Sequence, residues 1–225
     1  MNEIGKIKEK AICTGAVHFH ASLDSLEMAQ SIGIVMLDPI TRLSVDLINN
    51  SEHSRGNASH LSFAFSESEL PFHTDYPNLD IPPRFVLLRC IDEGALSIAT
   101  EYVSLSKFLC TSLSEKLLNE PWLMQTKTGR WKPCRIAAFN REGLLNIRFS
   151  SNIMRPFFPK RSSLSNLSMA AHKLFPVLRF VLKRGDYLLI DNWSGLHRRT
   201  NALENTTELK QVDGKSRVLE RVLIA

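Results

Sequence analysis

From about residue 60 onward, the chain consists of short apolar runs separated by turn residues. Runs of this length that are bounded by Pro, Gly, Asp or Asn are typical of β-strands. The clearest runs are LSFAF at 61–65, RFVLLRCI at 84–91, LSIATEYVSL at 96–105, GLLNIRFSS at 143–151, DYLLID at 186–191 and SRVLERVLI at 216–224. Several short strands of this kind favour a sandwich, a jelly roll or a barrel over a parallel-sheet fold.

Helical patterns are fewer and shorter. Apolar residues recur with helical spacing in three stretches, and one polar, glycine-containing stretch is typical of a surface loop. Residues 33–37 form an apolar run that predicts a short buried strand, which Asp38 and Pro39 would end. The expected helices span 23–32, 108–118 and 164–174, and the expected loop spans 51–59.

The composition agrees with one globular domain. The chain has 225 residues, of which 44% are hydrophobic and 23% charged, so it has enough apolar material for a core. No stretch approaches the roughly 18 to 20 apolar residues that a membrane span needs, and we expect no association with a membrane. We expect a mainly β (α+β) single domain over residues 1–225, with residues 1–50 as a helix and strand segment that packs on its core.

Charge and cysteine usage exclude some other classes. Lys and Arg exceed Asp and Glu by 28 to 23, a modest excess without the aromatic or zinc-ligand spacing of nucleic-acid-binding modules, so no nucleic-acid partner is expected. The four cysteines form no CxxC pair, and the N-terminus lacks the apolar run of a secretory signal. These features predict reduced thiols in a cytoplasmic protein.

The sharpest local motif is His73-Thr74-Asp75. On a strand, residues two apart share a face, so His73 and Asp75 could hold adjacent positions on one metal ion. A His-x-Asp tripeptide is common, however, and by itself it more often forms a hydrogen-bonded pair than a metal site.

A further histidine, His197, follows the DYLLID run after a short turn. Two imidazoles and one carboxylate are the ligand set of a non-haem Fe(II) facial triad, which leaves three positions open.

Four ordered motifs together resemble one enzyme family. The chain is similar to the Fe(II)- and 2-oxoglutarate-dependent oxygenases of the taurine dioxygenase and clavaminate synthase-like superfamily. The motifs that carry the resemblance are FHTD at 72–75, PPRFVLLRC at 82–90, GDYLLIDNWSGLHRR at 185–199 and RVLER at 217–221. The resemblance implies a double-stranded β-helix, or jelly roll, with a few flanking helices.

The resemblance also implies the roles of individual residues. His73, Asp75 and His197 would be catalytic residues that bind Fe(II), with 2-oxoglutarate and O2 as cosubstrates. The first arginine of the terminal pattern, Arg217, would hold the distal carboxylate of 2-oxoglutarate. A guanidinium fork is also the natural bidentate partner of a carboxylate on chemical grounds. Arg217 and Arg221 lie on one strand face, which makes Arg221 a candidate for contact with substrate or cosubstrate.

Two further assignments stay open between alternatives. A hydroxyl group on the strand after the His-x-Asp motif would bond the same carboxylate, and either Ser97 or Thr100 could supply it. Their opposite strand parity means that both cannot point inward without a bulge. Arg148 matches loosely a family position near the pocket and, with Arg221, suggests a small-molecule substrate that bears a carboxylate, such as an amino acid or a specialised metabolite.

The resemblance favours some reactions over others. Halogenating members of the family replace the carboxylate ligand with a small residue, so the presence of Asp75 favours hydroxylation or desaturation. The alternative from another class is a non-catalytic jelly-roll protein that binds a metal or acts as a sensor.

Overall fold

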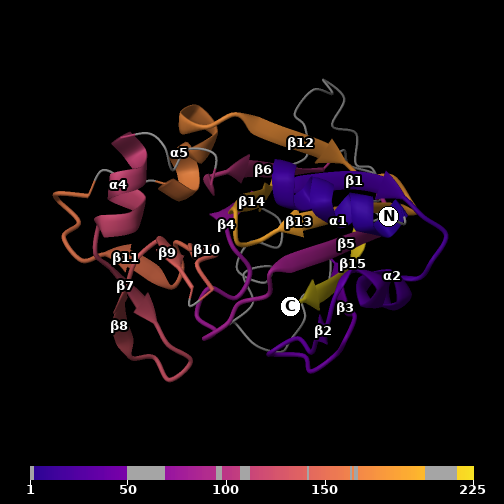
Figure 1. The fold of residues 1–225 in the computed structure, drawn as a ribbon, viewed down its shortest axis with the longest axis horizontal. Helices are drawn as coiled ribbons and strands as arrows, with labels where there is room; N and C mark the ends of the chain where they lie inside the picture. Colours follow the sequence, from indigo (N-terminus) through magenta and orange to yellow (C-terminus); the bar gives the residue numbers. More distant parts are fainter. Residues whose placement is uncertain are drawn as a thin grey trace, which may run out of the picture.

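The computed structural model describes residues 3–49, 69–94, 98–106, 112–140, 142–162, 164, 167–200 and 217–225. Two antiparallel sheets in this part of the chain carry most of its strands (Figure 1). The larger sheet has the order β1-β13-β5-β15-β2, with β3 also paired with β15, and the smaller has the order β12-β6-β14-β4. The strands of the larger sheet are β1 (Ala16–His20), β2 (Val35–Met36), β3 (Asp46–Asn49), β5 (Phe85–Asp92), β13 (Asp186–Asp191) and β15 (Val218–Ile224). Those of the smaller sheet are β4 (Leu70–His73), β6 (Ala99–Ser104), β12 (Val177–Val181) and β14 (Gly195–Arg199).

The larger sheet is apolar on both faces, which explains why its strands read as continuous apolar runs. Successive side chains of a strand point to opposite faces. In β13, Tyr187 and Leu189 pack towards the N-terminal helices, whereas Leu188 and Ile190 pack towards the smaller sheet. Tyr102 of β6 belongs to the same inner cluster as Leu188. The space between the two sheets is therefore an apolar core along much of its length.

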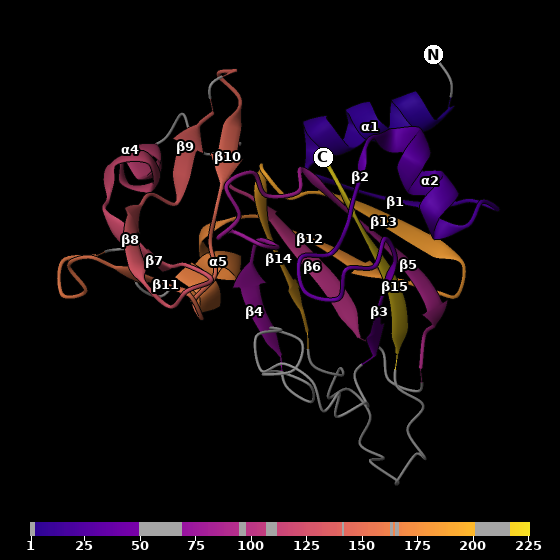
Figure 2. The same ribbon diagram turned by 90° about the horizontal axis from the view of Figure 1, so that it is seen from below.

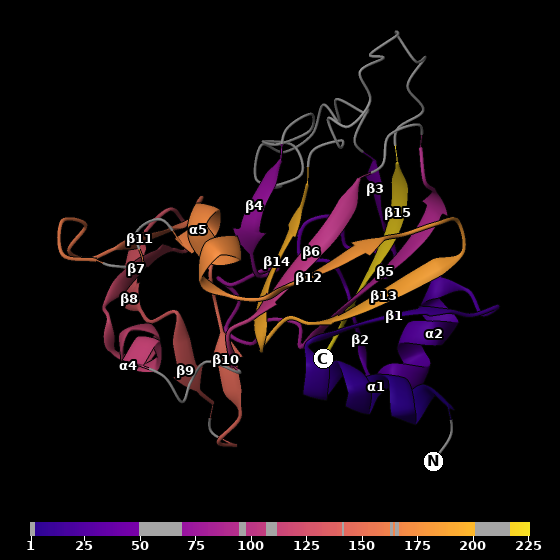
Figure 3. The same cartoon turned by 90° about the horizontal axis from the view of Figure 1, so that it is seen from above.

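Two helices cover the outer face of the larger sheet (Figures 2 and 3). They are α1 (Glu3–Thr14) and α2 (Ser25–Ile32). Asp24 caps α2, because its side chain accepts the backbone N–H of Glu27 while the Glu27 side chain accepts the N–H of Asp24. The helix expected at 23–32 is confirmed to within two residues.

A third cluster of elements lies beside the smaller sheet (Figure 1). Its buried side chains form a separate apolar core around Trp122 and Phe149, which meet edge to face with ring centroids 5.7 Å apart. The elements here are α4 (Ser112–Asn119), β7 (Trp122–Gln125), β8 (Trp131–Cys134), β9 (Ala137–Phe139), β10 (Leu145–Ile147), β11 (Met154–Pro156) and α5 (Leu167–Leu174).

The observed architecture confirms the predicted mainly β fold with a few helices. The strands expected near 84–91, 96–105, 186–191 and 216–224 are present as β5, β6, β13 and β15. The expected strand at 61–65 and the expected loop at 51–59 lie outside the described residues. Among the described residues, no helix has the length and apolar character needed to cross a membrane.

One expectation for the N-terminal part differs from the structure. The run at 33–37 contains β2, but this strand is half-buried rather than buried, and Ile34 and Leu37 on either side of it are exposed. The reason is that β2 pairs only with the end of β15, at the edge of the larger sheet. All three N-terminal strands belong to the larger sheet, because β1 pairs with β13, and β2 and β3 pair with β15.

The turn between β13 and β14 is hydrogen-bonded to the His-x-Asp motif. Asp191 accepts the backbone N–H of Trp193 through Oδ1 at 3.1 Å, which closes the turn. Asn192 reaches across to the His-x-Asp motif, where its Oδ1 accepts the backbone N–H of Asp75 at 2.8 Å and its Nδ2 donates to the Asp75 carbonyl at 3.1 Å. A second Nδ2 bond goes to the carbonyl of Pro83 at 2.9 Å. The turn residues therefore fix the backbone of Asp75.

The burial of Asp191 predicts that the stability of the folded protein depends on pH. Burial raises the pKa of this carboxyl from 3.8 to about 6, against the lowering effects of Arg84 and of the Trp193 N–H. The folded state then holds a proton that the unfolded state has released, so stability falls as pH rises from about 4 to about 6 and stays low above that. The free energy of unfolding of Asp191→Asn minus that of wild type should therefore rise by up to about 3 kcal/mol from pH 3.5 to pH 7. Urea unfolding at the two pH values measures this difference.

Asp186 at the other end of β13 provides the control. Burial raises the pKa of its carboxyl, but the Lys183 N–H and His18 outweigh burial, and the net shift is downward. The difference between Asp186→Asn and wild type should therefore change with pH in the opposite direction. A pH-independent difference for Asp191→Asn would contradict the assignment.

Candidate metal centre

Two strands of the smaller sheet bring the candidate metal ligands together. His197 on β14 lies directly opposite His73 on β4 in the antiparallel register, and the centroids of the two rings are 4.5 Å apart. Asp75 follows β4 immediately, and its Oδ1 lies 3.6 Å from Nε2 of His73 and 4.0 Å from Nε2 of His197. One ligand atom from each of the three residues lies within 4.8 Å of the others. The 3.6 and 4.0 Å separations are short enough for one ion with bonds of about 2.0–2.2 Å to span them.

Hydrogen bonding and burial act on the two imidazoles. Nδ1 of His73 lies 2.8 Å from the carbonyl of Pro71, and because a carbonyl can only accept, this nitrogen donates, while Nε2 is the nitrogen that faces Asp75. Burial and the neighbouring His73 lower the pKa of His197 to about 3, although Asp75 acts in the opposite direction. His197 is therefore neutral at physiological pH, and its Nδ1 is buried without a partner among the described residues.

Asp75 is ionised although it is buried. Burial alone would raise its pKa, but the charge of Arg221 is the largest opposing influence, and the pKa of Asp75 lies well below its usual range. Two imidazoles and one carboxylate are a donor set that suits a divalent transition-metal ion. The residues therefore fit the Fe(II) that the sequence motifs imply.

The three residues open into a cavity of about 850 Å³ between the two sheets. This volume is in the range of sites for small molecules. Thr100 of β6 and two residues at the inner face of the larger sheet, Arg217 and Arg221, line the same cavity. The spacing of Arg217 and Arg221 predicts that they share one face of a strand. This face points into the cavity that the candidate ligands also line.

Arg217 is a buried cation without a carboxylate partner in the described part of the chain. It is 4% exposed, and its guanidinium donates to the carbonyl of Ile98 at 2.9 Å and to Oγ1 of Thr100 at 3.1 Å. Its Nε is buried and unpartnered among the described residues. Burial lowers the pKa of Arg217 to about 10, so the guanidinium is still charged at neutral pH. An uncompensated buried guanidinium that lines a cavity is a site for an anionic ligand.

The remaining predicted site residues have different positions. Ser97 lies outside the described residues, whereas Thr100 contacts Arg217 directly. Arg148 is not among the residues that line the cavity, and it donates instead to the backbone carbonyls of Leu79 and Asp80, at 2.7 and 2.8 Å. It thereby holds the segment after the His-x-Asp motif. Substrate contact by Arg148 stays a prediction.

Arg221 lies in a group of acidic residues that the sequence analysis did not identify. Its guanidinium lies 2.9 Å from Asp38, 2.9 Å from Asp46 and 3.5 Å from Asp75. Asp38 was interpreted only as the end of a strand, and no local signal connects it to a residue 183 positions away. Asn192 lies in the turn that precedes His197, and its bonds to Asp75 depend on the fold rather than on any local pattern.

No protein-family model matches the chain, and no curated protein sequence matches it. Several solved structures are similar to it over almost its whole length. An asparagine oxygenase in complex with Fe(II), 3-hydroxyasparagine and succinate has a TM-score of 0.71 at 14% identity, with 99% of this chain and 77% of that chain covered. A taurine dioxygenase from Burkholderia xenovorans has a TM-score of 0.69 at 16% identity, with 99% and 80% covered.

PvcB, an Fe, alpha-ketoglutarate-dependent oxygenase from an isonitrile synthetic pathway, has a TM-score of 0.67 at 18% identity, with 99% and 80% covered. At these identities the likeness is one of fold. The chain therefore has the fold of the taurine dioxygenase and clavaminate synthase-like oxygenases, as its motifs predicted.

Proposed function

We propose that the protein is an Fe(II)- and 2-oxoglutarate-dependent dioxygenase that hydroxylates or desaturates a small molecule. The observation that carries the proposal is the placement, in one cavity, of the three ligand residues and of Arg217, whose charge no described carboxylate balances. A metal site alone would not need such a cation. The solved structures with this fold include oxygenases in complex with Fe and alpha-ketoglutaric acid or with Fe(II) and succinate.

The chain would provide binding and orientation for this reaction. His73, Asp75 and His197 would hold the iron, and Arg217 with Thr100 would hold the distal carboxylate of 2-oxoglutarate. When bound, iron and 2-oxoglutarate supply the oxidising power, because oxidative decarboxylation to succinate activates O2 for attack on a C–H bond. The cavity between the sheets would keep the reacting groups away from bulk water.

The rest of the cavity wall suits a polar small-molecule substrate. The amide side chains of Asn78, Gln125 and Asn152 line it, and such groups can both donate and accept hydrogen bonds. Related folds bind hydroxylated amino acids, 3-hydroxyasparagine in one structure and 3-hydroxyarginine in another. We propose an amino acid or a specialised metabolite as the substrate class.

The first test is formation of the iron chelate. Adding Fe(II) and 2-oxoglutarate to the apo-protein without oxygen should produce a weak visible charge-transfer band, because the triad leaves open positions at which the keto acid can bind. His73→Ala should lose the band while its circular dichroism spectrum is retained. The exposed histidine His172 supplies the matched control, His172→Ala, which should keep the band.

Absence of the band in folded wild type would exclude the proposed function. If the band forms but no succinate appears with any candidate substrate, the non-catalytic binding protein becomes the better description.

The second test concerns the cosubstrate arginine. Arg217→Ala should weaken 2-oxoglutarate binding about 10- to 100-fold, because hydrogen bonds to a charged group contribute about 1.5–3 kcal/mol. Titration of the chelate band at saturating Fe(II) measures this affinity. Arg89→Ala is the control, since Arg89 pairs with Glu220 and does not line the cavity. Unchanged 2-oxoglutarate affinity in Arg217→Ala would remove Arg217 from the cosubstrate site.

A further inference from the structure

We propose that Asp38 and Tyr76 are positioning residues of the metal centre, which act through Arg221 to orient the carboxylate of Asp75. The inference rests on the proposed function, because it assumes that Asp75 binds the metal. It assigns a role in metal binding to the N-terminal segment, 37 residues before Asp75 in the chain.

The two oxygens of Asp75 have different surroundings. Oδ1 is the oxygen that lies near Nε2 of both histidines, at 3.6 and 4.0 Å. Oδ2 lies 3.5 Å from Nη1 of Arg221. The arginine therefore contacts the oxygen that does not face the histidines. An arrangement of this kind presents a single carboxylate oxygen to the ion, because groups behind a ligand fix its orientation.

Arg221 is itself held by a closed set of hydrogen bonds. Its Nη2 donates to Oδ2 of Asp38 at 2.9 Å, to Oδ2 of Asp46 at 2.9 Å and to the hydroxyl of Tyr76 at 3.2 Å. The Tyr76 hydroxyl in turn donates to Oδ2 of Asp38 at 2.5 Å. Asp38, Tyr76 and Arg221 thus contact one another pairwise, so none of the three can rotate without breaking two contacts.

Asp38 anchors this set to a hydrogen-bonded turn. Its Oδ1 accepts the backbone N–H groups of Ile40 and Thr41, at 2.8 and 2.9 Å, and its backbone carbonyl accepts the N–H of Arg42 at 3.0 Å. The residue is 2% exposed. Both of its oxygens are therefore committed, one to the turn and one to Tyr76 and Arg221. The position of Arg221 follows from the conformation of a turn in the N-terminal segment.

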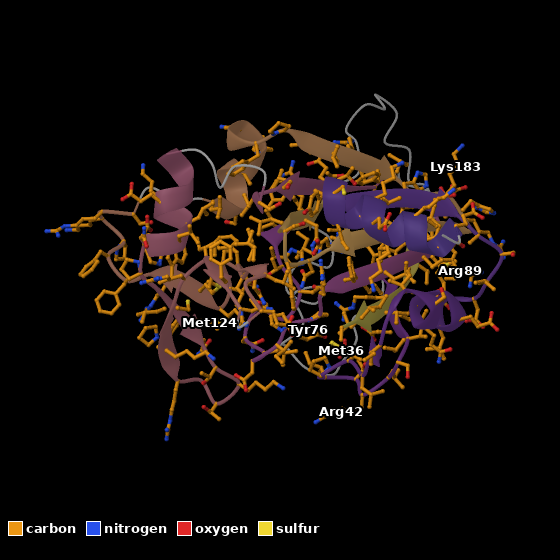
Figure 4. All side chains as sticks on the ribbon, viewed as in Figure 1. Met36, Arg42, Tyr76, Arg89, Met124 and Lys183 are labelled. Atoms are coloured by element: carbon orange, nitrogen blue, oxygen red, sulfur yellow. The ribbon has the colours of Figure 1, made fainter. Side chains whose placement is uncertain are left out.

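The backbone conformation of Tyr76 independently indicates that this residue has a functional role. Its φ angle is +51°, in the left-handed region that bulky residues rarely adopt. Strain of this kind persists where surrounding contacts enforce it, and it is concentrated at functional sites. Here the contacts are the two hydroxyl bonds and the Arg221 guanidinium, which lies 5.4 Å from the centre of the ring. Tyr76 and Met36, both labelled in Figure 4, pack against the same apolar cluster between the two sheets.

The charges of the cluster also match a metal ion rather than an anionic substrate. Asp38, Asp46 and Asp75 are buried around the guanidinium of Arg221, so within the described part of the chain their three carboxylates exceed its single positive charge by two. A divalent cation at Asp75 would balance them. Nη2 of Arg221 already faces three acceptors, and a substrate carboxylate there would meet Asp38 and Asp46 as well. This arrangement favours a positioning role for Arg221 over capture of an anion.

Tyr76→Phe is the most direct test, because it removes the hydroxyl without changing any charge. The probe is Co(II) added to the apo-protein, whose visible d–d absorption reports the geometry of its ligands. We expect Tyr76→Phe to weaken Co(II) binding on the order of 10-fold, as is usual for groups that orient metal ligands, and to change the shape of the spectrum. Tyr187→Phe is the matched control, since its hydroxyl donates to the Leu23 carbonyl at 2.6 Å in the helix-facing core, and it should bind Co(II) as wild type does.

A pair of aspartate variants separates positioning from charge. Asp38→Asn and Asp46→Asn each remove one carboxylate next to Arg221, but Asp38 also contacts Tyr76. Asp38→Asn should therefore weaken Co(II) binding more than Asp46→Asn and should alter the d–d spectrum as Tyr76→Phe does. This comparison holds even if Tyr76→Phe fails to fold.

The possible outcomes are distinct. If wild type binds Co(II) and both Tyr76→Phe and Asp38→Asn match it in affinity and spectrum, the positioning role is wrong while the proposed function stands. If Asp38→Asn and Asp46→Asn lose affinity equally with an unchanged spectrum, charge alone explains the effect and the positioning role is again wrong. If folded wild type binds no Co(II), the proposed function fails, and the positioning role fails with it.

Discussion

The register between β4 and β14 is the constraint on which the site depends. His73 and His197 face each other only because these strands pair in one register, and a slip of one residue would turn one imidazole to the opposite face. β14 is seated closely against β6 at Gly195, where a Cβ atom would lie 2.2 Å from the carbonyl oxygen of Val103. Any larger residue at Gly195 would push β14 away from its neighbour, so this glycine helps to place a histidine two residues later.

Two groups of buried charge lie at the site, and they come from different parts of the chain. Arg217 brings a positive charge that no described carboxylate balances. Around Arg221 lie three aspartates, of which Asp75 lines the cavity. A divalent cation and a dianionic keto acid match these two groups in sign, and unbalanced buried charges of this kind are costly unless a ligand pairs with them. Binding of the pair would therefore relieve a cost that the fold imposes.

Local pattern was sufficient to predict β5, β6, β13 and β15 and to single out the candidate metal ligands. The two-residue period placed Arg217 and Arg221 on one face, and both line the cavity. It could not decide between Ser97 and Thr100, because the parity of β6 relative to the cavity depends on its pairing with β14. The elements from β7 to β11 were missed in large part because they are strands of three or four residues with partly exposed side chains, which leave little periodic signal.

The contacts around Arg221 show why a motif can identify a residue and still leave its role undetermined. The terminal pattern marks Arg221 by its spacing from Arg217, and this spacing fixes only the face of β15 on which both lie. The role depends on the surrounding charges, which come from Asp38 and Asp46, far away in sequence. A guanidinium in an otherwise neutral pocket attracts an anion, whereas one among three carboxylates is already neutralised. In this chain the N-terminal segment therefore determines what Arg221 can do, and it directs Arg221 towards Asp75, the candidate metal ligand.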